Sequence, residues 1–246
     1  MKQITLLFLL IVQSTIAQNS LFNQIEAKNI GPTIMSGRVV DLAVNPKNPT
    51  EFYVAYATGG LWYTNNNGTS FSPVMDAAET VNCGSVTVDW NSGTIWVGTG
   101  EVNASRSSYA GVGVLKSSDK GKTWENLGLK DSHHISRIWV NPSNLNEIVV
   151  AAVGHLYTTN KERGIYKSTD GGKSWKQTLF VAEDAGIIDL AVSKNNPKIM
   201  FAASWQKDRK AWHFDGDGEK SGIYKSEDGG TSWKLVTTKE SGFPAN

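Results

Sequence analysis

Three long polar segments of the sequence, residues 100–111, 154–163 and 205–221, combine aromatic rings with planar polar groups. Aromatic rings stack on the apolar faces of sugars and peptides, while amides, guanidinium groups and carboxylates fix hydroxyls or backbone groups. This mixture favours binding of a glycan or a peptide; alternatively, the tryptophans pad the segments onto the fold and the charges are solvated. The candidate ligand-binding residues are Glu101, Asn103, Arg106, His155, Trp205, Gln206, Arg209 and Trp212.

Carboxyl groups in and near these segments raise the possibility of glycoside hydrolysis, which needs two such groups converging on one bond. The sequence pairs no two of the candidates, so catalytic residues are not assigned. No serine-nucleophile motif, phosphate-binding loop or dinucleotide fingerprint is present, and the single cysteine, Cys83, lies at the edge of an expected strand. The carboxyl candidates are Glu101, Glu162, Glu183, Asp184 and Asp215.

A metal site is not expected from the histidines of the chain. Asp131, His133, His134 and His155 match no familiar ligand spacing, which favours capping or hydrogen-bonding roles. The stretch 215–219 alternates carboxylates as a calcium loop does, but it lacks the glycine and the closing glutamate of an EF-hand. We therefore predict no metal and no cofactor, and a solvated loop at 215–219.

The balance of charges bears on the class of partner. Lysine and arginine total 24 against 23 acidic residues, so no nucleic-acid partner is expected.

The N-terminus indicates the compartment. Residues 1–17 carry Lys2, an apolar run at 4–12 that is too short to span a bilayer, and a small residue at Ala17. This pattern predicts a signal peptide that is cut before Gln18, and hence a secreted or periplasmic protein that does not span the membrane.

A repeat organises the rest of the chain. Segments 60–71, 113–124, 164–175 and 222–233 align, and their turn glycines lie 53, 51 and 58 residues apart. Each is preceded by two apolar stretches around an Asn-, Pro- or Gly-rich turn, so one repeat holds four strands and predicts one β-propeller blade of about 50 residues. The residues that shape the turns are Asn66, Gly68, Phe71, Asp119, Gly121, Trp124, Asp170, Gly172, Trp175, Asp228, Gly230 and Trp233.

These turns, of the form SxDxGx[ST]W, resemble the Asp-box or bacterial neuraminidase repeat. Residues 22–246, including "NIGPTIMSGRV" at 29–39, resemble the N-terminal propeller of secreted bacterial proteins described as sortilin-like or glycosyl-hydrolase-like. The resemblance implies an all-β propeller fold and is poorly specific for function. Asp-box xyloglucanases carry an aspartate where this chain has Ala57, and the arginine that precedes Ile-Pro in sialidases is missing.

The predicted organisation is a signal peptide (1–17), a closing strand (18–30) and four blades (31–80, 81–131, 132–184 and 185–246). The interval between each turn aromatic and the first strand of the next repeat is nearly constant. Counted back from the first repeat, it places residues 22–30 where the fourth strand of a preceding blade would lie, and the sequence offers no other strands for that blade. We therefore expect a fragment of a propeller of seven or more blades; a closed ring of four blades is the geometric alternative.

The length of the connections predicts where a ligand binds. Connections between the second and third strands lengthen from blade two onward, and all of them emerge on the face opposite the repeated turns. We expect a secreted module that binds a glycan or a peptide or protein there, together with the remaining blades of a longer chain. The alternatives are part of a glycoside hydrolase completed by a C-terminal region, and a purely structural platform.

Overall fold

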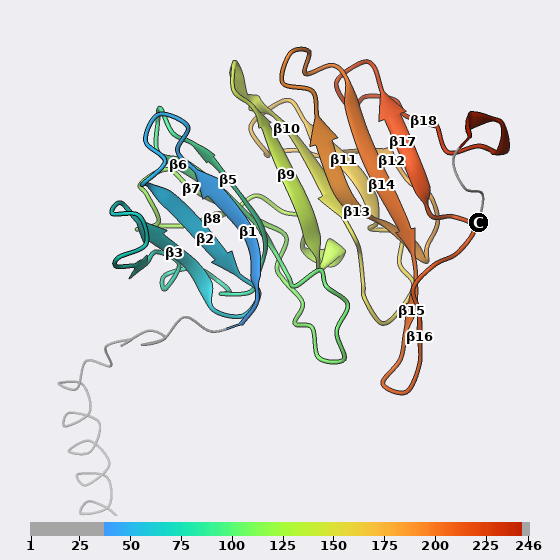
Figure 1. Cartoon of the computed structure of the whole chain (residues 1–246), viewed down its shortest axis with the longest axis horizontal. Helices are drawn as coiled ribbons and strands as arrows, with labels where there is room; N and C mark the ends of the chain where they lie inside the picture. Colours follow the sequence, from blue (N-terminus) through green and yellow to red (C-terminus); the bar gives the residue numbers. More distant parts are fainter. Residues whose placement is uncertain (1–36, 243–246) are drawn as a thin grey trace, which may run out of the picture. The chain divides into compact units, whose positions relative to one another are not determined.

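The computed structural model describes residues 37–242, and this part of the chain is all-β (Figure 1). Four four-stranded antiparallel sheets follow one another along the sequence, as predicted. The strands of each sheet lie inside one of the four predicted blade ranges. The predicted signal peptide and the strand at 18–30 lie outside the described residues, and the total of seven or more blades stays a prediction.

The sheets have the following strands. The first contains β1 (Val39–Val44), β2 (Phe52–Tyr56), β3 (Gly60–Thr64) and β4 (Ser72–Pro73). The second contains β5 (Cys83–Asp89), β6 (Thr94–Thr99), β7 (Val114–Ser117) and β8 (Glu125–Asn126). The third contains β9 (Ile135–Asn141), β10 (Asn144–Ala152), β11 (Gly164–Ser168) and β12 (Lys176–Leu179). The fourth contains β13 (Ala185–Val192), β14 (Met200–Gln206), β17 (Gly222–Ser226) and β18 (Lys234–Leu235).

The strands are hydrogen-bonded in sequence order within each sheet. The fourth sheet differs because a short hairpin, β15 (Asp208–Arg209) with β16 (Phe214–Asp215), is inserted between its second and third strands. Two single-turn 3-10 helices, η1 (Lys130–Ser132) and η2 (Lys239–Ser241), complete the described elements. The loop predicted at 205–221 is therefore partly wrong, since Trp205 and Gln206 end β14 and residues 208–215 form a hairpin.

Each first strand carries a register irregularity at an equivalent position, which the sequence did not reveal. In β1 it falls between Val39 and Asp41, and in β13 between Ile187 and Asp189. Arg137 of β9 pairs through Nε with Asp189 Oδ1 at 2.8 Å and through Nη1 with Asp41 Oδ2 at 3.7 Å. Bulges re-aim side chains, and here polar residues at the bulges link first strands of different sheets.

Apolar layers fill the spaces between successive sheets. The first two sheets share a core that includes Leu61 and Val97, and the second and third share one that includes Trp96 and Ile148. The third and fourth sheets meet around Ile165 and Met200. Burial of apolar surface between sheets therefore holds the repeat together, which is the packing expected of propeller blades.

There are four repeat turns, at residues 64–71, 117–124, 168–175 and 226–233, and the last three share one hydrogen-bond pattern. In the third, Ser168 Oγ donates to Asp170 Oδ1 at 2.8 Å and accepts from Gly172 N at 2.9 Å. Asp170 also accepts from Ser174 N at 3.0 Å and from Ser174 Oγ at 2.6 Å. These donors lower the pKa of Asp170 to about 2. The carboxylate thus organises its own turn and is not free for chemistry.

The first repeat turn replaces the aspartate with Asn66 and keeps the geometry. Asn66 Oδ1 accepts from Thr64 Oγ1 at 2.9 Å and from Ser70 N at 3.0 Å. In the third turn the hydroxyl of Ser174 donates to the carboxylate of Asp170. The equivalent bond of the first turn runs the other way, because Asn66 Nδ2 donates to Ser70 Oγ at 2.9 Å. An amide therefore serves in place of the carboxylate at this turn.

Candidate functional site

The long connections between second and third strands gather at one end of the sheets. Residues 100–113, 153–163 and 207–221 form what we call the loop layer (Figure 1). The repeat turns lie at the opposite ends of the antiparallel strands. A separate apolar cluster joins two of these connections to the fourth sheet and is formed by Val102, Ala104, Val153, Leu156, Ile188 and Trp205. The layer therefore has a core of its own.

Hydrogen bonds lock neighbouring connections of the loop layer together. Tyr157 Oη donates to Ser105 O at 2.7 Å and accepts from Ser108 N at 2.8 Å. Lys207 Nζ donates to Leu156 O at 2.8 Å and so ties the fourth sheet to the third. These contacts hold the loops against one another and give the layer a defined surface.

The β15–β16 hairpin projects beyond the end of β14 (Figure 1). The guanidinium carbon of Arg209 lies 5.0 Å from the ring centroid of Phe214, and Lys210 N donates to His213 O at 2.8 Å. At the tip, Trp212 is 85% exposed. The indole of Trp212 is therefore not packed against the fold, and its predicted role in ligand binding stays a prediction.

Trp205 packs against the hairpin, in contrast to Trp212. Its indole Nε1 donates to Gly216 O at 2.7 Å, and its ring meets Phe214 edge-on at 6.3 Å between centroids. The ring is half-buried. Of the two roles considered for the tryptophans, packing of a connection onto the fold is therefore the one that fits Trp205.

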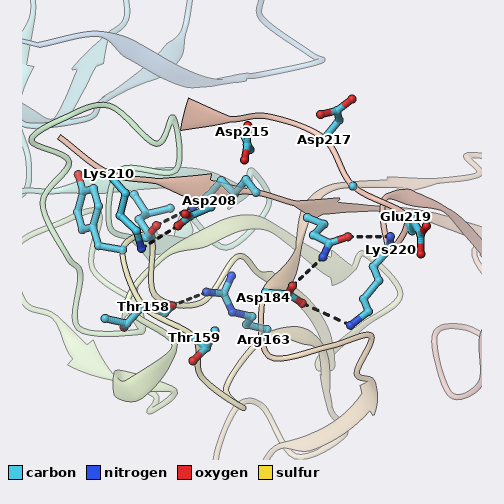
Figure 2. A pocket seen from close by; sticks show the side chains of 15 residues that line it. Thr158, Thr159, Arg163, Asp184, Asp208, Lys210, Asp215, Asp217, Glu219 and Lys220 are labelled. Carbon is cyan, nitrogen blue, oxygen red and sulfur yellow. Dashed lines mark hydrogen bonds and ion pairs between the residues drawn. The ribbon is translucent and has the colours of Figure 1, made fainter. Parts of the chain in front are cut away.

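A pocket of about 520 Å³ lies between the hairpin, the 153–163 connection and the turn before β13 (Figure 2). Gln206 closes one side, because its Nε2 donates to Asp184 Oδ2 at 2.7 Å and its Oε1 accepts from Lys220 N at 3.0 Å. Lys220 Nζ lies 3.8 Å from Asp184 Oδ1. The predicted residue Gln206 thus shapes this pocket and positions one of its carboxylates.

Two buried cations also line the pocket. Arg163 is 3% exposed and donates to the carbonyl oxygens of Val153, His155 and Thr158 at 2.8, 2.5 and 2.7 Å. Lys207 is 7% exposed. Burial lowers the pKa of Arg163 to about 10, and burial together with the positive charge of Arg163 lowers the pKa of Lys207 to about 8. Sequence reasoning missed both residues, since a single Lys or Arg in a polar loop gives no signal of burial.

The predicted binding residues of the second sheet are placed differently from one another. Glu101 is 1% exposed and forms an ion pair with Arg38 Nη2, so its side chain is not presented on the surface of the loop layer. Asn103 and Arg106 are exposed in the same connection. Glu101 is therefore best described as a structural anchor, and the two exposed residues remain candidates.

Two of the four histidines stack on each other. The rings of His133 and His155 are stacked, with centroids 3.7 Å apart and planes 20° apart. His155 Nε2 lies 3.0 Å from Asp131 O, and its Nδ1 lies 3.1 Å from Thr158 Oγ1. Within residues 37–242 no group of three His, Cys, Asp or Glu side chains is arranged to hold a metal ion. The imidazoles pack the junction between two connections.

The carboxyl candidates for hydrolysis are only partly brought together. Asp184 and Asp215 line the same pocket, whereas Glu162 accepts a hydrogen bond of 3.1 Å from Asn160 Nδ2. Cys83 is fully buried, and burial raises the pKa of its thiol to about 12, which removes it as a nucleophile. Asp184 and Asp215 thus line one pocket, but no contact joins their carboxyl groups.

Comparison with known proteins identifies the fold family. The Sortilin-Vps10 family model, described as "Sortilin, neurotensin receptor 3", matches residues 113–244, more than half of the chain. The chain belongs to the sortilin/Vps10 family. This sortilin/Vps10 chain is 36% identical over 86 residues to vacuolar protein sorting/targeting protein 10 of Kluyveromyces lactis, in an alignment that covers 35% of the chain and 5% of that protein.

Solved structures similar to this sortilin/Vps10 chain are propellers of other families. An ancestral GH74 enzyme matches 85% of the chain with a TM-score of 0.60 and 20% identity, and 26% of that enzyme is covered. The GH74 xyloglucanase of Xanthomonas campestris matches 80% with a TM-score of 0.56 and 17% identity, covering 29% of it. YCF48 bound to a D1 peptide matches 87% with a TM-score of 0.51 and 14% identity, covering 58% of that chain. These likenesses show the β-propeller fold. Within residues 37–242 no helix has the length and apolar character needed to cross a bilayer.

Proposed function

We propose that this chain is a secreted β-propeller module that binds a polypeptide ligand on the loop layer. One observation carries the proposal: two connections of the loop layer share an apolar cluster with the fourth sheet, and a pocket there is lined by the hairpin whose tip carries the exposed indole of Trp212. A rigid layer with an exposed aromatic anchor and a polar pocket is the surface that peptide recognition needs. Family membership supports a binding role, since the matching model describes a receptor.

A polypeptide fits the pocket better than a neutral glycan. The pocket is lined by four cationic and five anionic side chains: Arg163, Lys207, Lys210, Lys220, Asp184, Asp208, Asp215, Asp217 and Glu219. Charged side chains and termini of a peptide complement such a lining, whereas neutral sugar hydroxyls leave desolvated charges unpaired. The similar fold of YCF48, whose structure contains a D1 peptide, is in keeping with this choice of ligand class.

Binding to a peptide array and a glycan array, with reducing-sugar release measured alongside, tests the proposal. We expect peptide binding that Trp212→Ala weakens by about tenfold, a loss in the range of an interface aromatic. Lys173→Ala, in an exposed position of the third repeat turn at the opposite end, is the matched surface control. Binding to glycans alone, or peptide binding that Trp212→Ala leaves unchanged, would refute the proposal.

Glycoside hydrolysis is a second candidate function. Asp184 and Asp215 line one pocket, and two carboxyl groups at one bond are what hydrolysis requires. Release of reducing sugar from a polysaccharide, lost on both Asp184→Asn and Asp215→Asn, would favour this function. Hydrolysis that survives both changes would exclude this pocket as the catalytic site.

A further inference from the structure

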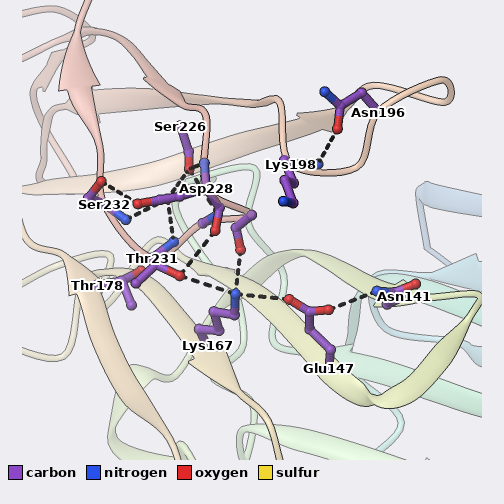
Figure 3. A network of polar contacts seen from close by, with 12 residues as sticks. Asn141, Glu147, Lys167, Thr178, Asn196, Lys198, Ser226, Asp228, Thr231 and Ser232 are labelled. Atoms are coloured by element: carbon purple, nitrogen blue, oxygen red, sulfur yellow. Dashed lines mark hydrogen bonds and ion pairs between the residues drawn. The ribbon is translucent and has the colours of Figure 1, made fainter.

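The repeat offers an internal comparison at the end of the sheets that carries the repeat turns. In the third sheet, Lys167 Nζ lies 2.9 Å from Glu147 Oε1, while Asn141 Nδ2 donates to Glu147 Oε2 at 2.7 Å (Figure 3). Lys167 Nζ also donates to Gly229 O at 2.8 Å and to Thr231 Oγ1 at 3.2 Å in the turn of the fourth sheet. At this junction of two sheets, an ammonium group therefore lies between a carboxylate and the next repeat turn.

The first sheet repeats the carboxylate but not the ammonium. Glu51 holds the position of Glu147, and Asn45 Nδ2 donates to its Oε2 at 2.7 Å. Tyr63 replaces Lys167, and its hydroxyl donates to Glu51 Oε1 at 2.5 Å. The bonds from Tyr63 and Asn45 lower the pKa of Glu51, so the side chain is ionised at neutral pH. Within residues 37–242 Glu51 takes part in no ion pair, so its charge lacks the partner that Glu147 has.

Three aromatic rings line a pocket of about 330 Å³ beside this carboxylate, which we call the aromatic pocket. The ring centroid of Tyr53 lies 4.8 Å from that of Tyr63 and 5.5 Å from that of Trp90. At the junction of the third and fourth sheets the repeat has Val149 and Lys194 in place of the first and the last of these rings. A carboxylate among aromatic faces is a lining that attracts an organic cation.

Two lysines lie at the edge of the aromatic pocket, and neither pairs with the carboxylate. Lys47 Nζ donates to Asn91 Oδ1 at 2.9 Å. Lys120 is exposed, its side chain packs over Gly93, and it forms no ion pair within the described part of the chain. Because Lys120 also lines the pocket, its charge competes with that of a cationic ligand and limits the affinity.

We infer that the aromatic pocket binds an alkylammonium group, with its nitrogen beside Glu51 and its carbon atoms against the three rings. The group takes the place that the Lys167 ammonium fills between the third and fourth sheets. Each carboxylate oxygen of Glu51 accepts one side-chain hydrogen bond and keeps a second acceptor site for the ligand. The pocket lies at the end of the sheets opposite the loop layer, so this inference does not depend on the proposed function.

Choline is a suitable probe, with dimethylbutanol, in which carbon replaces the nitrogen, as its neutral isostere. The readout is the indole N–H signal of Trp90 in the NMR spectrum of the whole chain, assigned from its loss in Trp90→Phe. We expect choline to shift this signal saturably, and dimethylbutanol or sodium chloride to leave it unchanged. N-acetyl-lysine methylamide forms the second arm: tighter binding than choline assigns a lysine side chain as the ligand, and weaker binding assigns a free methylated amine. A Trp90 signal that is indifferent to both cations overturns the inference.

Tyr63→Lys is the most informative variant, because it copies an arrangement that the third sheet already contains. The introduced ammonium should fill the site and weaken choline binding by about tenfold or more, whereas Tyr63→Phe, which keeps the ring, should weaken it by less than about threefold.

Glu51→Gln removes the charge while keeping the shape, and it should also weaken choline binding by about tenfold. Glu125→Gln, in an exposed position of β8, is the matched control and should have no effect. Lys120→Met should strengthen binding, because it removes the competing charge. Choline binding that is equal in the wild type, Tyr63→Lys and Glu51→Gln would overturn the inference, and the wild-type comparison of choline with dimethylbutanol decides it if these variants do not fold.

Discussion

The indole Nε1 of Trp175 donates a 2.7 Å hydrogen bond to the carbonyl oxygen of Leu127, which belongs to the preceding sheet. Trp124 makes the corresponding bond to Val74 O at 3.2 Å, and Trp233 reaches Thr178 Oγ1 at 3.3 Å. Each turn tryptophan is half-buried between its own sheet and the sheet before it. The aromatic residue of the repeat therefore joins two sheets.

Trp175→Ala is expected to lower the free energy of unfolding by about 3 to 5 kcal/mol, the range for removing a packed indole. Trp175→Phe should cost less, because it keeps most of the apolar contact and loses only the bond to Leu127 O. Denaturant unfolding of the two variants checks this. An equal effect of the two changes would mean that the hydrogen bond, and not the packing, dominates.

Replacing Asp170 tests the polar half of the same turn. Asp170→Asn should be tolerated better than Asp170→Ala, since Asn66 already fills the equivalent position in the first turn through its amide. Both should be milder than Trp175→Ala. Unfolding in urea is again the measurement, and greater loss from Asp170→Ala than from Trp175→Ala would contradict the assigned roles.

The glycines of the third turn offer a matched pair. Gly171 and Gly172 both have positive φ, of 79° and 92°. A Cβ at Gly172 would lie 2.7 Å from Leu127 Cδ1, whereas at Gly171 the nearest atom is Asn146 Oδ1 at 3.1 Å. We expect Gly172→Ala to be more destabilising than Gly171→Ala by about 1 to 3 kcal/mol, the usual cost of overpacking. Equal thermal unfolding midpoints for the two variants would show that Leu127 and the preceding sheet move aside at little cost in stability.

Much of the fold was predictable because its signals are local and periodic. The turn glycines and tryptophans recur with the hairpins, and that periodicity specified four four-stranded sheets. The burial of Glu101, Arg163 and Lys207 was not predictable, since it depends on which loops of different sheets pack together. The position of Trp212 at the tip and the packing of Trp205 were also not predictable, because both depend on a short hairpin that the other repeats lack.

Acid should destabilise the protein through His134. This residue is 2% exposed, and burial with the neighbouring His133 and Lys207 lowers its pKa to about 3. The folded state then binds fewer protons than the unfolded state, whose histidine titrates near 6.5, so stability falls as the pH drops from about 7 toward 3. Through this group, the free energy of unfolding changes by at most roughly 1.4 kcal/mol per pH unit.

His134→Gln removes that titration and should flatten the dependence between pH 6.5 and 4. Urea unfolding at several pH values provides the comparison with the wild type. His213→Gln serves as the control, because His213 is exposed in the hairpin. An unchanged slope in His134→Gln would assign the acid sensitivity to other groups.

The most direct test of the binding account is the affinity of a peptide selected on the wild-type chain for two variants with an intact fold. The account predicts that Trp212→Ala, in the loop layer, raises the Kd by about tenfold, and that Lys173→Ala, at the opposite end of the sheets, leaves it unchanged. A Kd raised by Lys173→Ala and indifferent to Trp212→Ala would place the ligand at the repeat turns and contradict the account.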